Sequence, residues 1–222
     1  MFKFIKRFII FILVIVVIAV GGTLIFLNSV KVNVTEDDLP EEVYDPSGNL
    51  ETMMQDKMIA IATSDQADTN ELFEDFLNMM IYKTIKDNVN PEYDPLNGDT
   101  DESEYIVKHS QFTLDYVIAE MTEDDQVRLT VSVKRGSFPS VSTAFYFLFD
   151  MEVIRTSMTF RLTLDKVYLD DNEIKYRVYN YFVSFADKDQ IESQVDKGTL
   201  DLDEYTYEVN FSNLIPSLFP GL

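Results

Sequence analysis

The side chains that most often carry catalysis or bind a metal ion are scarce in this sequence. The 222 residues include one histidine, His109, and no cysteine. A thiolate nucleophile, a disulfide framework and the usual zinc sites are therefore excluded. No glycine-rich phosphate loop and no G-x-S-x-G motif occurs. Because His109 lies at the start of an expected strand, we interpret it as an exposed or edge residue and not as a catalytic base.

A calcium loop is the metal site that the acidic residues come nearest to forming. Asn97, Asp99 and Asp101 alternate as at the start of such a loop. The sixth position of the pattern is Glu102, where glycine is needed, and the twelfth is Lys108, where glutamate is needed. We therefore expect a solvated, turn-rich loop here, with no metal ion and no other cofactor.

Acidic residues dominate the chain beyond residue 28. All 39 Asp and Glu follow that position, whereas three of the 18 basic residues, Lys3, Lys6 and Arg7, precede it, which leaves a net charge of −24. Such a surface repels phosphate backbones, so we expect no nucleic-acid binding. At this acid content, adjacent acids such as Asp170-Asp171 are expected in turns, and nothing singles out a glycosidase-type pair. The sequence therefore predicts that the protein is not an enzyme, unless two carboxylates converge in a cleft.

The most distinctive feature of the sequence is its apolar, aromatic content. The chain has 17 Phe and 12 Tyr, and the stretch SVSTAFYFLFD at residues 140–150 runs without a charge until its last residue. As a strand, it would turn three rings to one face and two large side chains to the other: Phe145, Phe147 and Phe149 against Tyr146 and Leu148. A strand that is apolar on both faces is covered on both faces. A helix over 141–154 stays open as an alternative, because the run contains no glycine or proline.

We expect this strand, its neighbours and one helix to supply the lining of an apolar groove or a packed core. The residues are Phe138, Phe145, Phe147, Phe149, Phe160, Leu162, Tyr176 and Phe182, with Phe76 and Met80 from the helix.

One long helix is predicted over about 70–86. Leu, Phe, Met and Ile recur there at the spacing of one helical face, and acidic residues occupy the first turns, where they suit the helix dipole. This face must pack against something, and the sheet that follows is the best candidate. The segment 50–62 fits a short helix or a strand.

From residue 105 onward the apolar period changes to two, which predicts half-buried strands of an antiparallel sheet. The alternating segments are 112–118, 129–133, 158–164 and 205–211, and Ile174, Tyr176 and Val178 are expected to open a longer strand. Acidic turns at 123–125 and 170–173 have hairpin chemistry. The predicted fold class is therefore α+β.

The N-terminal residues predict a membrane anchor. Residues 8–27 form a run of 20 without a charge, which spans a hydrocarbon core of about 30 Å. A cleaved signal peptide would have a shorter apolar region that ends in small residues. The basic tail at 1–7 places the N-terminus in the cytoplasm. We therefore expect a single-pass protein of the cell membrane, with a stalk over 28–68 and an extracytoplasmic domain over 69–222.

The order of these elements resembles a known family. A basic tail, a transmembrane helix and a stalk precede NELFEDFLNMMIYKTI, VRLTVSVKRGSFPSVSTAFYFLFD, MTFRLTLDKVYLDDNEI and a closing pair of strands. Residues 69–215 are in this respect similar to the YpmS-like membrane-anchored extracytoplasmic proteins of Gram-positive bacteria, which are in turn similar to the tubular lipid-binding superfamily. The resemblance implies a curved antiparallel sheet packed on one long amphipathic helix, with an apolar groove that can hold an acyl chain. The run DMEVIR lacks the expected glycine-containing turn, and the acidic stretch 90–104 is extra.

Two functions follow as expectations. In the first, the extracytoplasmic domain sequesters a lipid or a lipid-linked molecule in an apolar groove. In the second, the same aromatic residues are ordinary core, and the domain is a non-catalytic accessory or docking subunit that binds a protein partner in a cell-envelope complex.

Overall fold

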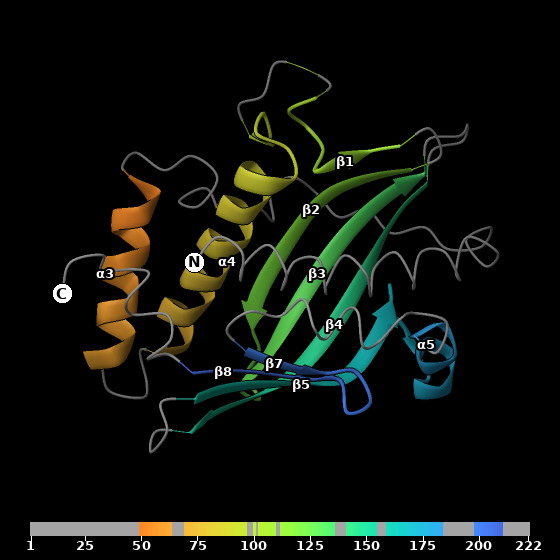
Figure 1. Cartoon of the computed structure of the whole chain (residues 1–222). Helices are drawn as coiled ribbons and strands as arrows, with labels where there is room; N and C mark the ends of the chain where they lie inside the picture. The colour runs from red at the N-terminus through yellow and green to blue at the C-terminus, as the bar shows by residue number, and fades with distance from the viewer. Residues whose placement is uncertain are drawn as a thin grey trace.

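The structure is a computed structural model that describes residues 49–63, 69–96, 100, 102–109, 112–135, 141–154, 159–183 and 198–210. In chain order the elements are α3 (Leu50–Thr63), α4 (Thr69–Asn88), β1 (Val107–Lys108), β2 (Phe112–Met121), β3 (Gln126–Arg135), β4 (Val141–Ile154), β5 (Thr159–Leu169), β6 (Asn172–Ile174), α5 (Tyr176–Val183), β7 (Gly198–Asp201) and β8 (Thr206–Asn210) (Figure 1). The predicted anchor at 8–27, Phe138, and residues 97–99 and 101 of the calcium-like pattern lie outside the described residues. No helix in the described part of the chain is long and apolar enough to cross a membrane.

The described strands form one antiparallel sheet. Its order is β1-β2-β3-β4-β5-β8-β7, and β6 pairs with β5. The stretch 141–154, for which a helix was the alternative, is a strand, β4. The strands predicted at 112–118 and 129–133 are confirmed as β2 and β3. The turn residues Asp125 and Asp170 have left-handed backbones, with φ of 58° and 49°, as the acidic hairpin turns require.

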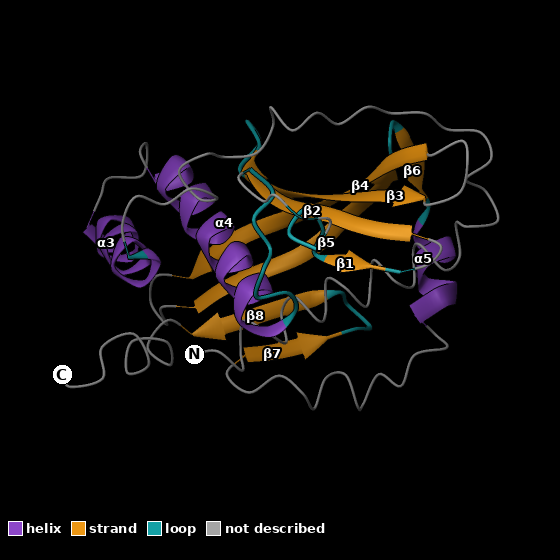
Figure 2. Cartoon of the chain, turned by 90° about the horizontal axis from the view of Figure 1, so that it is seen from above, coloured by secondary structure: helices purple, strands orange, loops and turns teal. Residues whose placement is uncertain are grey.

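A β-bulge marks the bend of the sheet. On the β4–β5 ladder Leu148 pairs with Lys166, whereas the next residue, Phe149, pairs with Leu164. Asp165 is therefore an extra residue on β5, and such an insertion bends the strand and increases its twist. Figure 2 shows the resulting curvature, with β7 and β8 lying opposite β2 and β3 across the axis of the molecule.

Helix α4 closes the open edge of β2. β1 covers only the beginning of that edge, so the rest needs other partners. The side-chain amide of Asn78 donates to the Ala119 carbonyl at 2.7 Å, and its Oδ1 accepts the Ala119 N–H at 2.8 Å. The Glu74 carboxylate accepts the Met121 N–H at 2.6 Å. Two side chains of a helix thus take the place of a neighbouring strand.

The same helix also contacts the inside of the curve. Phe73 of α4 packs against Phe160 of β5, with ring centroids 4.9 Å apart. Because β5 lies three strands from β2, the sheet must curl toward the helix for both contacts to form. The face of the sheet that carries Phe160 is therefore the inner face. The predicted fold, a curved antiparallel sheet packed on one long helix, is confirmed.

The segment 50–62, for which helix and strand were both open, is a helix. Asn49 caps α3, because its Oδ1 accepts the Glu51 N–H at 2.9 Å. Ion pairs join α3 to α4: Lys83 lies 3.2 Å from Glu51, and Lys57 pairs with Asp75. α3 therefore packs on the side of α4 away from the sheet, as Figure 1 also shows.

The prediction that Ile174, Tyr176 and Val178 open a longer strand is wrong. β6 ends at Ile174, and α5 begins at Tyr176. The apolar residues of YRVYNYFV alternate only at the start. Tyr176, Tyr179 and Val183 recur at helical spacing, and that longer period decides the structure.

Candidate functional site

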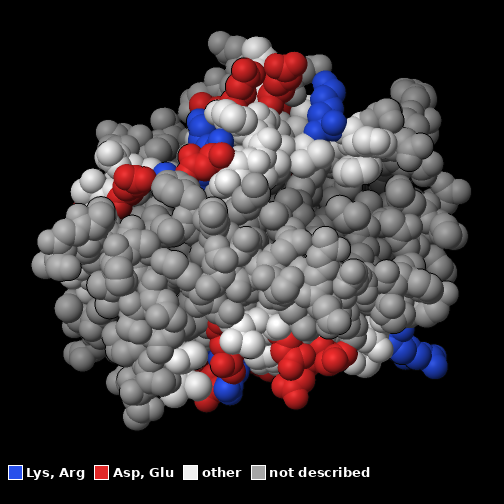
Figure 3. Space-filling model, in the orientation of Figure 1, with Lys and Arg blue, Asp and Glu red and all other residues white. Residues whose placement is uncertain are grey.

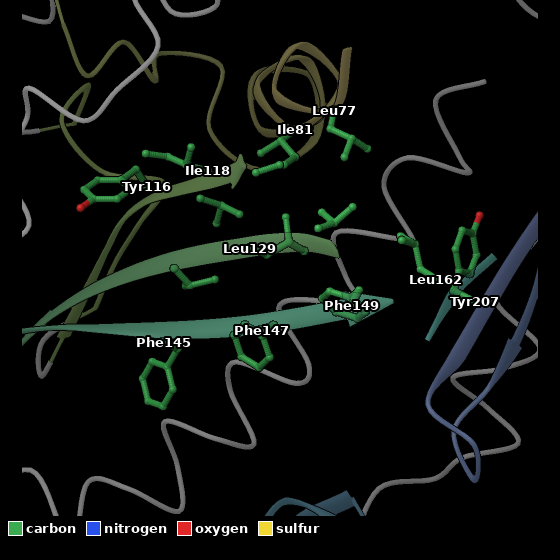
Figure 4. Packing of buried hydrophobic residues seen from close by; sticks show 14 of the residues in the cluster. Leu77, Ile81, Tyr116, Ile118, Leu129, Phe145, Phe147, Phe149, Leu162 and Tyr207 are labelled. Carbon is green, nitrogen blue, oxygen red and sulfur yellow. The ribbon is translucent and has the colours of Figure 1, made fainter. Parts of the chain in front are cut away.

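The three phenylalanines of β4 lie side by side on the inner face of the sheet. We call Phe145, Phe147 and Phe149 the aromatic row; their side chains are 0 %, 1 % and 2 % exposed. The rings of Phe145 and Phe147 stack with centroids 6.4 Å apart. Figure 4 shows the row running along β4, with Leu162 and Tyr207 at its far end.

Cross-strand partners extend this apolar surface over the neighbouring strands. On β3 the partners of the aromatic row are Val131, Leu129 and Val127, and on β5 they are Leu169, Val167 and Leu164. All of these side chains are buried. Past the bulge the inner face continues through Leu162 and its partner Tyr207 to Leu200 on β7. Because directly opposed side chains lie about 5 Å apart, these residues form one continuous apolar surface.

The outer face of β4 differs from the inner face. Ala144 is buried on this side, whereas Tyr146 and Leu148 are only half-buried, so the outer face is covered in part. The Arg128 guanidinium lies 5.9 Å from the centroid of the Tyr146 ring and pairs with Glu120 at 2.9 Å. Burial, and next to it the charge of Asp170, raises the pKa of the Tyr146 phenol. The outer face is thus a partly solvated polar surface.

The structure brings together most of the residues that the sequence singled out. Phe145, Phe147, Phe149, Phe160, Leu162 and Phe76 are buried in one hydrophobic cluster, and Met80 is partly buried against it. Tyr176 is not part of the lining, because it lies on α5 and is 53 % exposed. Phe138 lies outside the described residues, and Phe182 falls within α5 but not among its described side chains.

Sequence reasoning left Phe73 and Tyr207 off the list of lining residues. Phe73 belongs to the apolar face of the predicted helix, and Tyr207 to an alternating strand, so both signals were present. What the sequence does not give is the pairing of β5 with β8, which places Tyr207 opposite Leu162. Burial raises the pKa of the Tyr207 phenol far above its ordinary value. The hydroxyl therefore stays neutral inside the apolar surface.

Two partly buried carboxyl groups, Glu74 on α4 and Asp115 on β2, have raised pKa values. Burial raises the pKa of Glu74, and its hydrogen bond from the Met121 N–H opposes the rise. Burial also raises the pKa of Asp115, against a hydrogen bond from Thr113 at 2.7 Å. The Glu74 carboxylate thus holds the edge of β2, whereas the Asp115 carboxylate bonds to side chains of β2 and β3.

The described residues offer little for acid–base or metal chemistry. No group of three or more His, Asp or Glu among them is placed to hold a metal ion. His109 is exposed beyond the end of β1, as predicted, and its ring lies 5.2 Å from that of Phe112. What the arrangement can do is bury apolar surface.

Fold and site together define an α+β protein in which a curved antiparallel sheet turns an apolar face toward one long helix. Comparison with known proteins identifies no related protein. No family model matches the chain, and no curated protein and no solved structure matches it at a significant level.

Proposed function

We propose that this protein is a membrane-anchored, extracytoplasmic binder of a lipid or lipid-linked molecule. The observation that carries the proposal is the inner face, which is apolar without interruption from β3 to β5 around the aromatic row. A curved sheet with such a face matches an acyl chain in shape and in chemistry. The predicted anchor at 8–27 would keep the domain beside its source of lipid.

Binding would be driven by burial of apolar surface, at about 25 cal/mol for each Å² removed from water. From Phe145 to Phe149 the strand rises by about 13 Å, a length over which an acyl chain could lie along the rings. Because these side chains are 0–2 % exposed, a ligand reaches them only by displacing protein atoms that now contact them. The proposal therefore requires a second, lipid-filled arrangement of the domain, and no bond is made or broken.

A second candidate function rests on that same burial. If the aromatic row is permanently covered, it is core, and the domain is a non-catalytic docking subunit of a cell-envelope complex. In-cell crosslinking that recovers one dominant protein partner would favour this function over lipid binding.

Native mass spectrometry of the full chain, released from membranes in two unrelated mild detergents, separates the two functions. Lipid binding predicts an added mass of one lipid in both detergents. Phe147→Leu, on the inner face of β4, should reduce its occupancy several-fold. Leu148→Met, on the outer face of the same strand, is the matched control and should leave occupancy unchanged. A ligand-free protein in both detergents would contradict the proposal.

A further inference from the structure

The first turn of α5 exposes apolar side chains. Among the described residues, the large hydrophobic side chains with the greatest exposure are Ile59, Val89, Tyr176 and Val178. Ile59 and Val89 each stand alone in sequence, whereas Tyr176 and Val178, 53 % and 43 % exposed, are separated by one residue. Single exposed apolar residues are ordinary, but two in one helical turn need a reason.

Basic residues alternate with these two side chains. Lys175 and Arg177 are exposed, so the sequence Lys-Tyr-Arg-Val forms one projecting turn that we call the α5 patch. Figure 3 shows a basic side chain projecting over α5, whereas acidic side chains gather at other places on the same view. Within the segment 171–178 the exposed Asp171 and Glu173 balance Lys175 and Arg177, in a chain of net charge −21. The patch itself therefore combines two exposed apolar side chains with two cations that can approach lipid phosphates.

The turn is fixed to the end of the sheet. The ring of Tyr176 meets that of Tyr205 edge-on, with centroids 5.8 Å apart and planes at 87°. The Tyr205 hydroxyl donates to Oδ1 of Asn180 at 2.9 Å, and the Val178 N–H donates to the Lys175 carbonyl at 2.8 Å. Both Figures 1 and 2 place α5 at the end of the molecule away from α3. A patch held this way presents one fixed surface.

We propose that the α5 patch is the surface with which the domain contacts a phospholipid bilayer. Tyrosine favours the membrane–water boundary, valine can enter the acyl region, and lysine and arginine extend toward lipid phosphates. The inference rests on the proposed membrane anchoring. The 21 residues between the predicted anchor and Asn49 reach at most about 70 Å, so the domain stays close enough for a weak contact to form repeatedly.

The size of the patch favours a bilayer over a protein partner. A stable protein interface takes about 800 Å² and 20 or more residues from each side. One helical turn supplies far less. A tethered domain needs only a small, reversible membrane contact, which four residues can provide.

The experiment uses the full chain in phosphatidylcholine nanodiscs. Because the sequence has no cysteine, a single introduced cysteine is a unique site for an environment-sensitive fluorophore. Val178→Cys reports on the patch, and Ile59→Cys on α3, where the native side chain is 49 % exposed, is the matched control. Spin-labelled lipids in the disc should quench the label at 178 at least about twofold more than the label at 59. Adding Lys175→Glu and Arg177→Glu should lower quenching at 178 to the control level.

Equal quenching at 178 and 59 overturns the proposal, and so does quenching at 178 that survives the double charge reversal. Both labelled sites are exposed, and unchanged far-UV circular dichroism verifies that the variants fold. Failure of the chain to enter nanodiscs would instead contradict the membrane anchoring within the proposed function. If native mass spectrometry finds a bound lipid but quenching at 178 and 59 is equal, membrane contact by the α5 patch is refuted and the proposed lipid binding is not.

Discussion

Replacing Asn78 by alanine should destabilise the protein more than any other single asparagine change on α4. Asn78 is 4 % exposed, and its amide both donates to and accepts from the backbone of Ala119, which is 0 % exposed. The substitution leaves a buried N–H and a buried C=O without their partner. Each such group costs about 1–3 kcal/mol, so the expected loss in the free energy of unfolding is about 2–6 kcal/mol.

Asn88→Ala is the matched control for this prediction. Asn88 lies on the same helix, and its Nδ2 donates to the Thr84 carbonyl at 3.2 Å, within the helix. The propensity gain of alanine over asparagine is shared by both variants and cancels in their difference. Asn88→Ala should therefore cost less than about 1 kcal/mol.

Urea unfolding of the detergent-solubilised chain, followed by far-UV circular dichroism, measures both losses. The midpoint should fall with little change in the urea dependence, since the native surface is unchanged. Amide hydrogen exchange at Ala119 should accelerate in Asn78→Ala and not in Asn88→Ala. If the two variants differ by less than about 1 kcal/mol, the helix does not act as a substitute strand and the reasoning fails.

Substitutions at four further positions, Glu74, Phe147, Leu148 and Asp170, test other parts of the structure. Burial raises the pKa values of Glu74 and Asp115, so the folded state favours their protonated forms more than the unfolded state does. The free energy of unfolding should therefore fall as the pH rises above the ordinary pKa of a carboxyl group. Glu74→Gln should reduce the change in urea midpoint between pH 5 and 7. A wild-type midpoint that rises with pH in this range would contradict the expected direction. Phe147→Ala should cost about 3–5 kcal/mol and Leu148→Ala, on the other face of β4, less than about 2 kcal/mol, and equal losses in urea unfolding would refute the assignment of faces. Asp170→Ala should lower the free energy of unfolding by about 2–4 kcal/mol, because it removes a buried carboxylate that accepts from the Thr143 hydroxyl and the Ala144 N–H, at a residue with φ of 49°. Asp170→Asn should retain most of the stability. Thermal melts in which Asp170→Asn is the less stable variant would contradict this role.

The sequence alone predicted the helices and strands whose apolar residues repeat at one clear spacing. The face that joins Phe73, Leu77 and Ile81 predicted α4, and the alternation through Leu129 predicted β3. The two-sided run of β4 was recognisable as unusual. Its inner face is buried as expected, whereas its outer face is half-buried beside Arg128, which only the pairing with β3 reveals.

The features that the sequence did not predict depend on contacts between distant residues. Asn78 is a polar residue within an apolar helical face, and its partner Ala119 lies 41 positions later. The bulge at Asp165 becomes definite only through the pairing of β4 with β5, although the alternation of β5 already changes phase there, from Leu164 to Val167. The two-residue period at Tyr176 was too short to outweigh the helical spacing that follows it. For the candidate site, the sequence predicts the aromatic row but not whether a ligand can enter.

Site-specific photocrosslinking tests the central claim, lipid binding at the aromatic row, most directly. A diazirine analogue of leucine is placed at position 147 or at position 148 of the full chain, and the protein is irradiated in native membranes. Because Phe147 lies on the buried inner face and Leu148 on the half-buried outer face, lipid binding predicts a covalent lipid adduct at 147 that is absent or several-fold weaker at 148. Crosslinks from 147 only to the protein's own residues, with no lipid adduct, would contradict it.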